Sequence, residues 1–409
     1  MSRRSFMNLV GAAALSSGTL AAGAGGFRVR TITAGVELGG RDDLPRLDQA
    51  AAFLERGKAL FGEQWEVQTT RIATQPLAQY LPDWRQPQAM AKLVELDNWA
   101  QARNNMLSVG PVLTGTENAQ GFGEWAAELV TRTANTSFSC FAAAPGAGPQ
   151  PETINASAEA IVAIAANTPG GEGNFRFCAT ANCPSGTPFF PAAWHSGEPA
   201  FTIGLESPLV LLAALQDAES PIGMDQRLRA ALNRSLAPVD ALARQLASDT
   251  GWHYRGIDTS PAPGLQSSIG AVIERVSGVP FGAPGTLQAC AKITAVLKDL
   301  DVMTSGYCGL MLPVLEDTVL AQRADEGRYS VQELLLYSSV CGTGLDVVPV
   351  PGDSSVSTIA AIITDMAALS VRYTKPLSVR LFPVPGKAAG ERVEFNNPHL
   401  TACNVMPLG

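Results

Sequence analysis

Apolar positions follow two periods that alternate over most of the chain. Short runs rich in β-branched and aromatic residues, such as 27–36, are typical of strands, whereas 44–60 repeats its apolar residues at helical spacing. Further strands are expected at 65–72, 108–113, 137–143, 175–179, 200–205, 254–257, 310–314, 345–350 and 378–382. Further helices are expected at 90–102, 124–133, 157–166, 226–248, 265–275, 287–300, 331–340 and 358–369. This alternation predicts an α/β fold with a mainly parallel sheet.

The same alternation predicts how the domain closes. About ten β/α units follow one another without a long linker, which favours a single α/β barrel, with ten strands, over residues 25–409. In parallel α/β folds the chemistry lies at the carboxyl ends of the strands. This rule selects Glu37, Glu206, Ser207, Asp258, Thr259, Ser260, Glu316 and Asp317. Some of these residues are expected to cap helices instead, because Asp and Ser do so directly after a strand.

Composition narrows the class of protein. Hydrophobic residues make up 46% of the chain and charged residues 16%, so a large core is available and disorder is excluded. The net charge of −8 argues against a nucleic-acid partner, because such domains carry clustered basic charge. The only three histidines are His195, His253 and His399, which nearly excludes a metal site built from several histidines.

The first 24 residues have the pattern of an export signal. Arg3 and Arg4 precede a soft apolar stretch over 9–20, and Ala22-Gly23-Ala24 offers a signal-peptidase site. The prediction is a twin-arginine signal over 1–24, with the twin-arginine export machinery as a partner and a periplasmic or secreted location. A disordered start with a chance arginine pair is the alternative. The apolar run is too short for a stable membrane anchor.

Seven cysteines raise a disulfide question, because the predicted destination is oxidising. Cys178 and Cys183 lie five positions apart in a loop rich in Gly, Pro and Asn, and they form the favoured disulfide. Two free thiols or half of a zinc site are the alternatives, but no second cysteine pair with neighbouring histidines completes a zinc site. Cys308 lies in a flexible turn as a candidate reactive thiol, although a structural role is favoured for it.

Several familiar catalytic motifs are missing. The chain has no phosphate-binding loop, no G-x-G-x-x-G after a strand, no G-x-S-x-G and no H-E-x-x-H. What remains is His195 and Glu198, three residues apart in a tight loop, where an imidazole and a carboxylate could act as acid and base or hold one divalent cation. A backbone-bonded histidine beside a solvated Glu198 is the alternative. Lys375 and Arg380 flank a late strand and are candidate anion ligands, with solvated surface as their alternative.

Four ordered motifs resemble one known family. Residues 30–35 (R-T-I-T-A-G) resemble the opening of domain-of-unknown-function family 711, also called uncharacterised protein family 0210. Residues 195–198 (H-S-G-E), 341–346 (C-G-T-G-L-D) and 358–361 (T-I-A-A), the last followed by Arg380, are similar to its later motifs. The resemblance implies a fold like the pyruvate-formate-lyase-like barrel. It does not imply glycyl-radical chemistry, because the R-V-x-G-Y radical loop is absent.

Three hypotheses about function follow. The favoured one is a non-radical enzyme acting on a small polar or anionic metabolite, with His195 as acid or base, Glu198 orienting it, and Asp258 or Glu316 as second carboxylate. Arg380, Lys375 and Ser260 would then bind the substrate. A non-catalytic periplasmic binding protein and a metal-assisted hydrolase are the alternatives. No cofactor is identified, a divalent metal is not favoured, and a homo-oligomer is compatible with the low charge.

Overall fold

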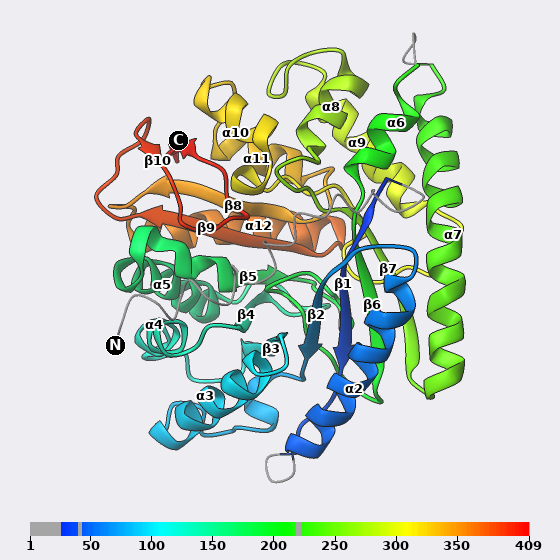
Figure 1. The fold of residues 1–409 in the computed structure, drawn as a ribbon. Helices are drawn as coiled ribbons and strands as arrows, with labels where there is room; N and C mark the ends of the chain where they lie inside the picture. The colour runs from blue at the N-terminus through cyan, green and yellow to red at the C-terminus, as the bar shows by residue number, and fades with distance from the viewer. Residues whose placement is uncertain (1–25, 40–42, 218–221, 409) are drawn as a thin grey trace.

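The computed structural model describes residues 26–39, 43–217 and 222–408, and its centre is one large sheet (Figure 1). The predicted export signal lies outside the described residues. In spatial order the nine strands are β7 (His253–Pro261), β6 (Ala200–Glu206), β1 (Arg28–Gly35), β2 (Val67–Ala73), β3 (Asn105–Leu113), β4 (Thr136–Ala143), β5 (Phe177–Ala181), β9 (Leu377–Val384) and β8 (Gly344–Pro351). A separate small sheet pairs β10 (Arg392–Val393) with β11 (Cys403–Asn404).

The large sheet consists of parallel groups that meet at two antiparallel borders. Strands β1 to β5 run parallel, β6 pairs antiparallel with β1, and β9 pairs antiparallel with β5. The outer pairs, β6 with β7 and β8 with β9, are again parallel. The predicted mixed α/β fold with a mostly parallel sheet is therefore confirmed. The sheet has nine strands in this structure, and no strand pairing closes it into the predicted ten-stranded barrel.

Helices cover the outside of the sheet (Figure 1). They are α2 (Asp43–Gly62), α3 (Pro87–Gln101), α4 (Phe122–Arg132), α5 (Pro151–Asn167), α6 (Pro208–Ala214), α7 (Met224–Thr250), α8 (Ile269–Ser277), α9 (Thr286–Lys298), α10 (Thr318–Asp325), α11 (Val331–Ser338) and α12 (Val356–Tyr373). Three short 3-10 turns are η1 (Leu77–Gln79), η2 (Pro169–Arg176) and η3 (Val314–Glu316). The α6 and α10 helices were not expected from the sequence.

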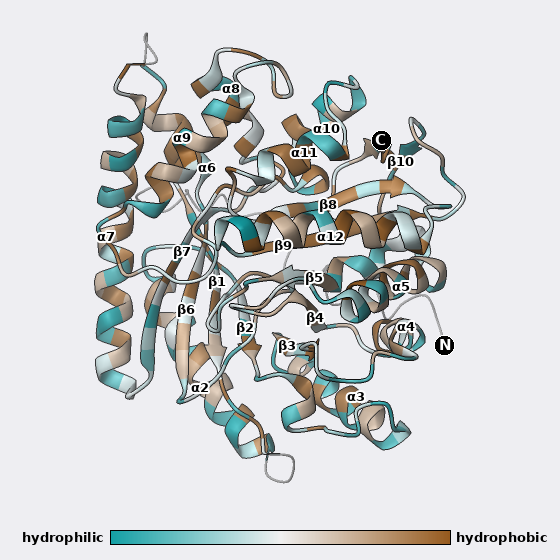
Figure 2. Ribbon diagram, turned by 180° about the vertical axis from the view of Figure 1, so that it is seen from behind, coloured by the Kyte–Doolittle hydropathy of each residue, from teal (hydrophilic) through white to brown (hydrophobic). Residues whose placement is uncertain are grey.

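The main apolar core lies between the sheet and these helices. Ile32 of β1 and Leu246 of α7 both approach α2 at Gly57, where a side chain would come within 3.4 Å of each. Figure 2 shows hydrophobic residues along much of α12, which packs against α5. Among the described residues, α12 is the one helix long and apolar enough to cross a membrane by length and composition alone.

The segment at 304–313 lies between the two edge strands of the sheet without forming a strand itself. Thr304 makes one parallel bridge to Ile257 of β7, and Pro313 makes one to Asp346 of β8. The expectation of a strand over 310–314 was therefore wrong. The physical reason is that side chains take up the N–H groups of this segment, and Pro313 has none to offer.

Asp258 and Ser260 are the side chains that bind this segment. The Asp258 carboxylate accepts from the N–H groups of Tyr307 (3.0 Å) and Cys308 (3.1 Å), and the Ser260 hydroxyl accepts from the N–H of Gly309 (3.1 Å). Both residues thus hold backbone in place.

A contact between two glycines fixes the same segment against the turn after α11. A Cβ added to Gly342 would lie 2.2 Å from the Cα of Gly309, which is backbone that cannot rotate away. We therefore expect Gly342→Ala to destabilise the fold by about 1–3 kcal/mol. Gly148→Ala is the matched control, because nothing lies within 4 Å of its added Cβ, and a change within about 0.5 kcal/mol is expected. Urea denaturation of both variants measures the difference, and equal effects would contradict the packing argument.

Candidate functional site

The loop between β5 and β6, residues 182–199, lies against the face of the sheet that the helices leave free. The Arg71 side chain on β2 donates to the carbonyl of Pro188 (2.9 Å), and the Ser108 hydroxyl on β3 donates to that of Ala193 (2.7 Å). The N–H of His195 donates to the carbonyl of Thr74 (2.9 Å), just after β2. We call this face the inner face. Two polar regions lie on the inner face beside this loop: a cavity at His195 and a charged cluster around Arg71.

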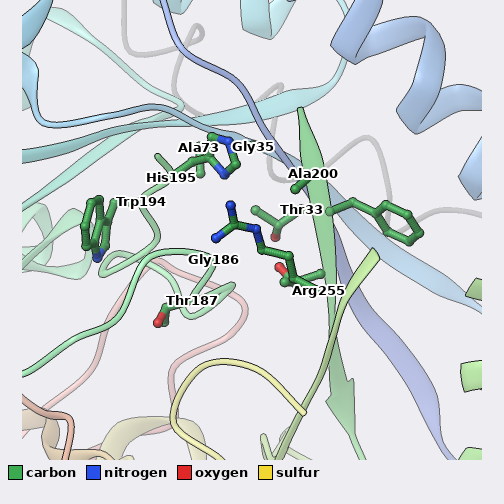
Figure 3. A pocket seen from close by; sticks show the side chains of 11 residues that line it. Thr33, Gly35, Ala73, Gly186, Thr187, Trp194, His195, Ala200 and Arg255 are labelled. Carbon is green, nitrogen blue, oxygen red and sulfur yellow. The ribbon is translucent and has the colours of Figure 1, made fainter. Parts of the chain in front are cut away.

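The His195 cavity is small (Figure 3). Its volume of about 10 Å³ leaves room for about one water molecule. It is lined by Thr33, Gly35, Ala73, Gly186, Thr187, Trp194, His195, Ala200, Phe201, Thr202 and Arg255. The His195 ring rests on Gly35, where a Cβ would come within 2.2 Å of Nδ1. The cavity as it stands therefore does not hold a metabolite.

Backbone groups hold the His195 ring. Its Nε2 lies 3.1 Å from the carbonyl oxygen of Gly197 and 3.0 Å from that of Glu198. The Glu198 side chain was expected to orient the ring, but that residue is exposed and the orienting contact comes from its carbonyl. The reason is the turn at Gly197, whose φ of +92° directs the chain back on the ring. A different acid, Glu37, accepts from the N–H of Gly197 (2.8 Å).

Burial lowers the pKa of His195, the two carbonyls oppose this shift, and the positive charge of Arg255 adds to it. The neutral imidazole is thus the favoured form in the fold, with an Nε2–H that donates to the two carbonyls.

The charged cluster consists of Arg30, Arg71, Arg380, Glu206, Glu316 and Asp346. Arg30 on β1 lies 3.3 Å from Glu206 at the end of β6 and 3.2 Å from Glu316 in η3. Arg380 on β9 lies 3.0 Å from the same Glu316 and 2.6 Å from Asp346 on β8. Acids and bases therefore alternate in one continuous row. Apart from Arg30, whose side chain is 20% exposed, these side chains are nearly buried.

Two groups in the cluster are incompletely satisfied. Arg71 joins no ion pair among the described residues, and its buried Nε has no hydrogen-bond partner. Burial lowers the pKa of Arg71 to about 9, and the positive charge of Arg30 adds to the effect. Asp346 accepts from Arg380 through Oδ1 (2.7 Å), while its buried Oδ2 has no partner. Burial raises the pKa of Asp346 to about 6, against the attraction of Arg380.

The predicted site residues do not form one site. Glu316 and Arg380 lie together in the charged cluster, as an ion pair. Lys375 lies outside the charged cluster and has a structural role. Its buried amine donates to the carbonyl of Cys341 (2.7 Å), just after the end of α11. Asp258 and Ser260 bind the 304–313 segment, and burial raises the pKa of Asp258 although its hydrogen bonds oppose this.

The predicted disulfide is absent from the structure. Cys178 and Cys183 are free and fully buried thiols that pack with Ala192 and Tyr307 on the inner face. The Cys183 thiol lies 3.5 Å from the Thr187 hydroxyl, and burial raises the pKa of both thiols. In the part of the chain that the structure describes, no three His, Cys, Asp or Glu side chains converge as a metal ion would require.

Arg30 and Arg71 were missing from the predicted site. Their signal in the sequence is a charged residue inside a segment with strand character, such as Arg71 in the run V-Q-T-T-R-I-A over 67–73. A charged residue in the middle of a strand that is covered on both sides marks a polar inner face.

The lowered pKa of His195 predicts a pH dependence of stability. Its folded-state pKa lies below the ordinary 6.5, so the unfolded chain takes up the proton first as the pH falls. The contribution of the neutral ring is therefore present above about pH 6.5 and lost towards lower pH. We expect His195→Gln to lose less stability than the wild type between about pH 7.5 and 5.5 in urea denaturation. His253→Gln, at an exposed position, is the control, and a His195→Gln profile parallel to the wild type would refute the argument.

Comparison with known proteins finds one matching family and several similar proteins. The family described as "Uncharacterised ACR (DUF711)" matches residues 24–396, a range that includes His195 and the whole charged cluster. A UPF0210 protein of Pyrobaculum arsenaticum is 37% identical over 228 residues, which cover 53% of this chain and 51% of the relative. The UPF0210 protein of Pyrobaculum islandicum is 33% identical, covering 65% of this chain and 61% of the relative.

A third relative, the UPF0210 protein of a Thermoanaerobacter species, is 33% identical over 54% of this chain and 50% of its own length. The alignments thus span 50% to 61% of the lengths of these relatives. The family match, by contrast, extends over most of the chain. This chain therefore belongs to the DUF711 family.

Proposed function

We propose that the chain is a non-radical enzyme that acts on a small polar or anionic metabolite by acid–base chemistry at the charged cluster. The observation that carries the proposal is the row of buried carboxylates and guanidinium groups on the inner face, in which Asp346 keeps one oxygen without a partner. Burying several ions costs free energy that an apolar core would not cost. Such a cost is common where perturbed acids and bases carry out chemistry.

Asp346 has the properties of the proton-transferring group. Arg380 fixes the orientation of its carboxyl through Oδ1, and Oδ2 remains open for a substrate proton. Burial brings its pKa close to the range in which a carboxylate can both accept and release a proton under ordinary conditions. Glu316 is held between Arg30 and Arg380, so it positions the two guanidinium groups.

In this proposal His195 and Glu198 have roles that differ from the acid–base pair expected from the sequence. His195 Nε2 is taken up by two carbonyls, which leaves Nδ1 beside Gly35 and the one-water cavity. This arrangement favours a positioning role, in which the ring holds the 182–199 loop over the inner face. It equally favours the second candidate function, a small-molecule binding protein without turnover.

Two further features belong to the proposal. The 304–313 segment touches both edge strands of the sheet, which supports a barrel like that of the pyruvate-formate-lyase-like fold with this segment as an irregular tenth member. Arg3, Arg4 and the Ala22-Gly23-Ala24 sequence support export by the twin-arginine route.

The catalytic role of Asp346 can be tested by proton exchange. The purified protein is incubated in D₂O with a panel of small carboxylic, hydroxy and amino acids, and loss of C–H signals is followed by NMR. For a substrate found in this way, the rate should fall as the pH drops below about 6, because a protonated Asp346 no longer accepts a proton. Asp346→Asn should lower the rate by about 100-fold or more.

Asp365→Asn is the matched control, because Asp365 is exposed on α12. It should leave the rate unchanged. An Asp346→Asn protein that folds and retains the wild-type rate would show that the proton transfer lies elsewhere.

Export can be tested at the arginine pair. Replacing Arg3 and Arg4 together by Lys preserves charge but removes the pair that the twin-arginine route requires. In a bacterial host with this route, the wild type should appear in the periplasm in a shortened form, and the double variant should stay in the cytoplasm at full length. Cell fractionation with immunoblotting distinguishes the two. Equal export of the variant would remove the twin-arginine assignment.

A further inference from the structure

Two arginines in the described part of the chain, Arg71 and Arg176, are buried without an ion pair, and they differ in how their charge is satisfied. Arg176 donates to the Thr133 hydroxyl (2.8 Å), the Thr136 carbonyl (3.1 Å) and the Val130 carbonyl. Arg71 donates only to the Pro188 carbonyl (2.9 Å), through Nη1. The hydrogen bonds of Arg176 are thus explained by a structural role, whereas Arg71 keeps N–H donors that a structural role does not use.

The open side of Arg71 has the geometry of an anion site. Its bond to Pro188 uses Nη1, so the opposite edge of the guanidinium group, formed by Nε and Nη2, has no protein partner. Two parallel N–H groups on one edge match the two oxygens of a carboxylate or a phosphate group. A buried cation without a counter-ion and with an unpaired N–H is costly, and an anion would supply the charge and the missing hydrogen bond.

The walls of this site are aromatic and cationic. The guanidinium of Arg71 lies 5.4 Å from the centre of the Phe190 ring, and that of Arg380 lies 5.6 Å from the Phe189 ring. Arg30 and Arg380 both add positive potential at Arg71, with Glu316 as the opposing charge. The positive potential from Arg30 and Arg380 favours a small anion over a cation, while the two ring faces pack against guanidinium groups that are already present.

The charged cluster comes closest to the surface at Arg30, beside the C-terminal segment. The side chain of Arg30 is 20% exposed, and the exposed residue His399 lies close enough to Arg30, Glu316 and Arg71 for their charges to act on its ring. The N–H of Thr401 donates to the Leu315 carbonyl (2.7 Å), which ties this segment to the turn that carries Glu316.

We infer that Arg71 is the anion-binding residue of the charged cluster and that the ligand carries a carboxylate or phosphate group held by Nε and Nη2. This inference rests on the proposed function, since it takes the cluster as the place where substrate lies. Its test measures binding and not turnover, so the two can fail separately. If the protein binds the anion through Arg71 but converts no substrate, the anion site is supported and the proposed enzymatic function is refuted.

Equilibrium dialysis of the purified protein tests the inference with two probes in parallel, inorganic phosphate and malonate, and with the uncharged malonamide as a blank. We expect the wild type to bind one of the two anions below about 1 mM, in the range usual for metabolites. The anion that binds more tightly tells whether the ligand group is a phosphate or a carboxylate. Arg71→Gln should weaken that binding by about 10- to 100-fold, because it removes the charge and the paired N–H donors.

Arg176→Gln is the matched control, because it removes another buried arginine without an ion pair but should leave anion binding unchanged. If Arg71→Gln fails to fold, Arg71→Lys decides, since Lys keeps the charge and loses the two-donor edge and should bind more weakly than the wild type. Binding of neither anion by the wild type overturns the inference. Equal binding by the wild type and the folded Arg71 variant overturns it as well.

Discussion

Glu316 binds two arginines that stand on strands separated by four others in the sheet. Its carboxylate lies 3.2 Å from Arg30 on β1 and 3.0 Å from Arg380 on β9. A flat sheet places such strands more than 20 Å apart, since neighbouring strands lie about 4.8 Å from each other. The double contact therefore requires the sheet to curl until β1 and β9 face one another. The same curvature brings the buried charges together and encloses the 182–199 loop, which Arg71, Ser108 and Thr74 hold.

The curl also explains why the inner face is polar. Helices pack on the outer face and bury apolar side chains such as Ile32, and in the described part of the chain no α-helix lies on the inner face. The interior is filled instead by a loop, and a loop brings N–H and carbonyl groups that need partners. Arg71, Ser108 and the main chain of Thr74 are those partners. The polar residues of the inner strands thus serve the loop first, and Arg71 is the one that is left with donors to spare.

The sequence predicted the strands and most helices because their apolar periods come from the outer core, where burial alone decides. It failed at 310–314, because side chains bond the N–H groups at the start of this apolar run and directly before it. Asp258 and Ser260 bind the N–H groups of Cys308 and Gly309, and Thr294 binds that of Leu310. Asp317 is one of the selected residues that caps a helix, as was expected for some of them, although the helix itself, α10, was not expected. The charged cluster could not be assembled from the sequence, because its members meet only through the curvature of the sheet, which no local pattern encodes.

The long sequence separations within the cluster have a consequence for how the protein is made. Arg30 is synthesised near the start and Arg380 near the end, so the ribosome needs about 20 to 70 s between them. For most of that time Arg30 and Arg71 have no Glu316 beside them, and until Arg380 follows the ion pairs that span the curled sheet are incomplete. The row of ions forms only when nearly the whole chain has been released. An incomplete chain, whether truncated or stalled, keeps its arginines in water and exposes the strands that β9 would cover.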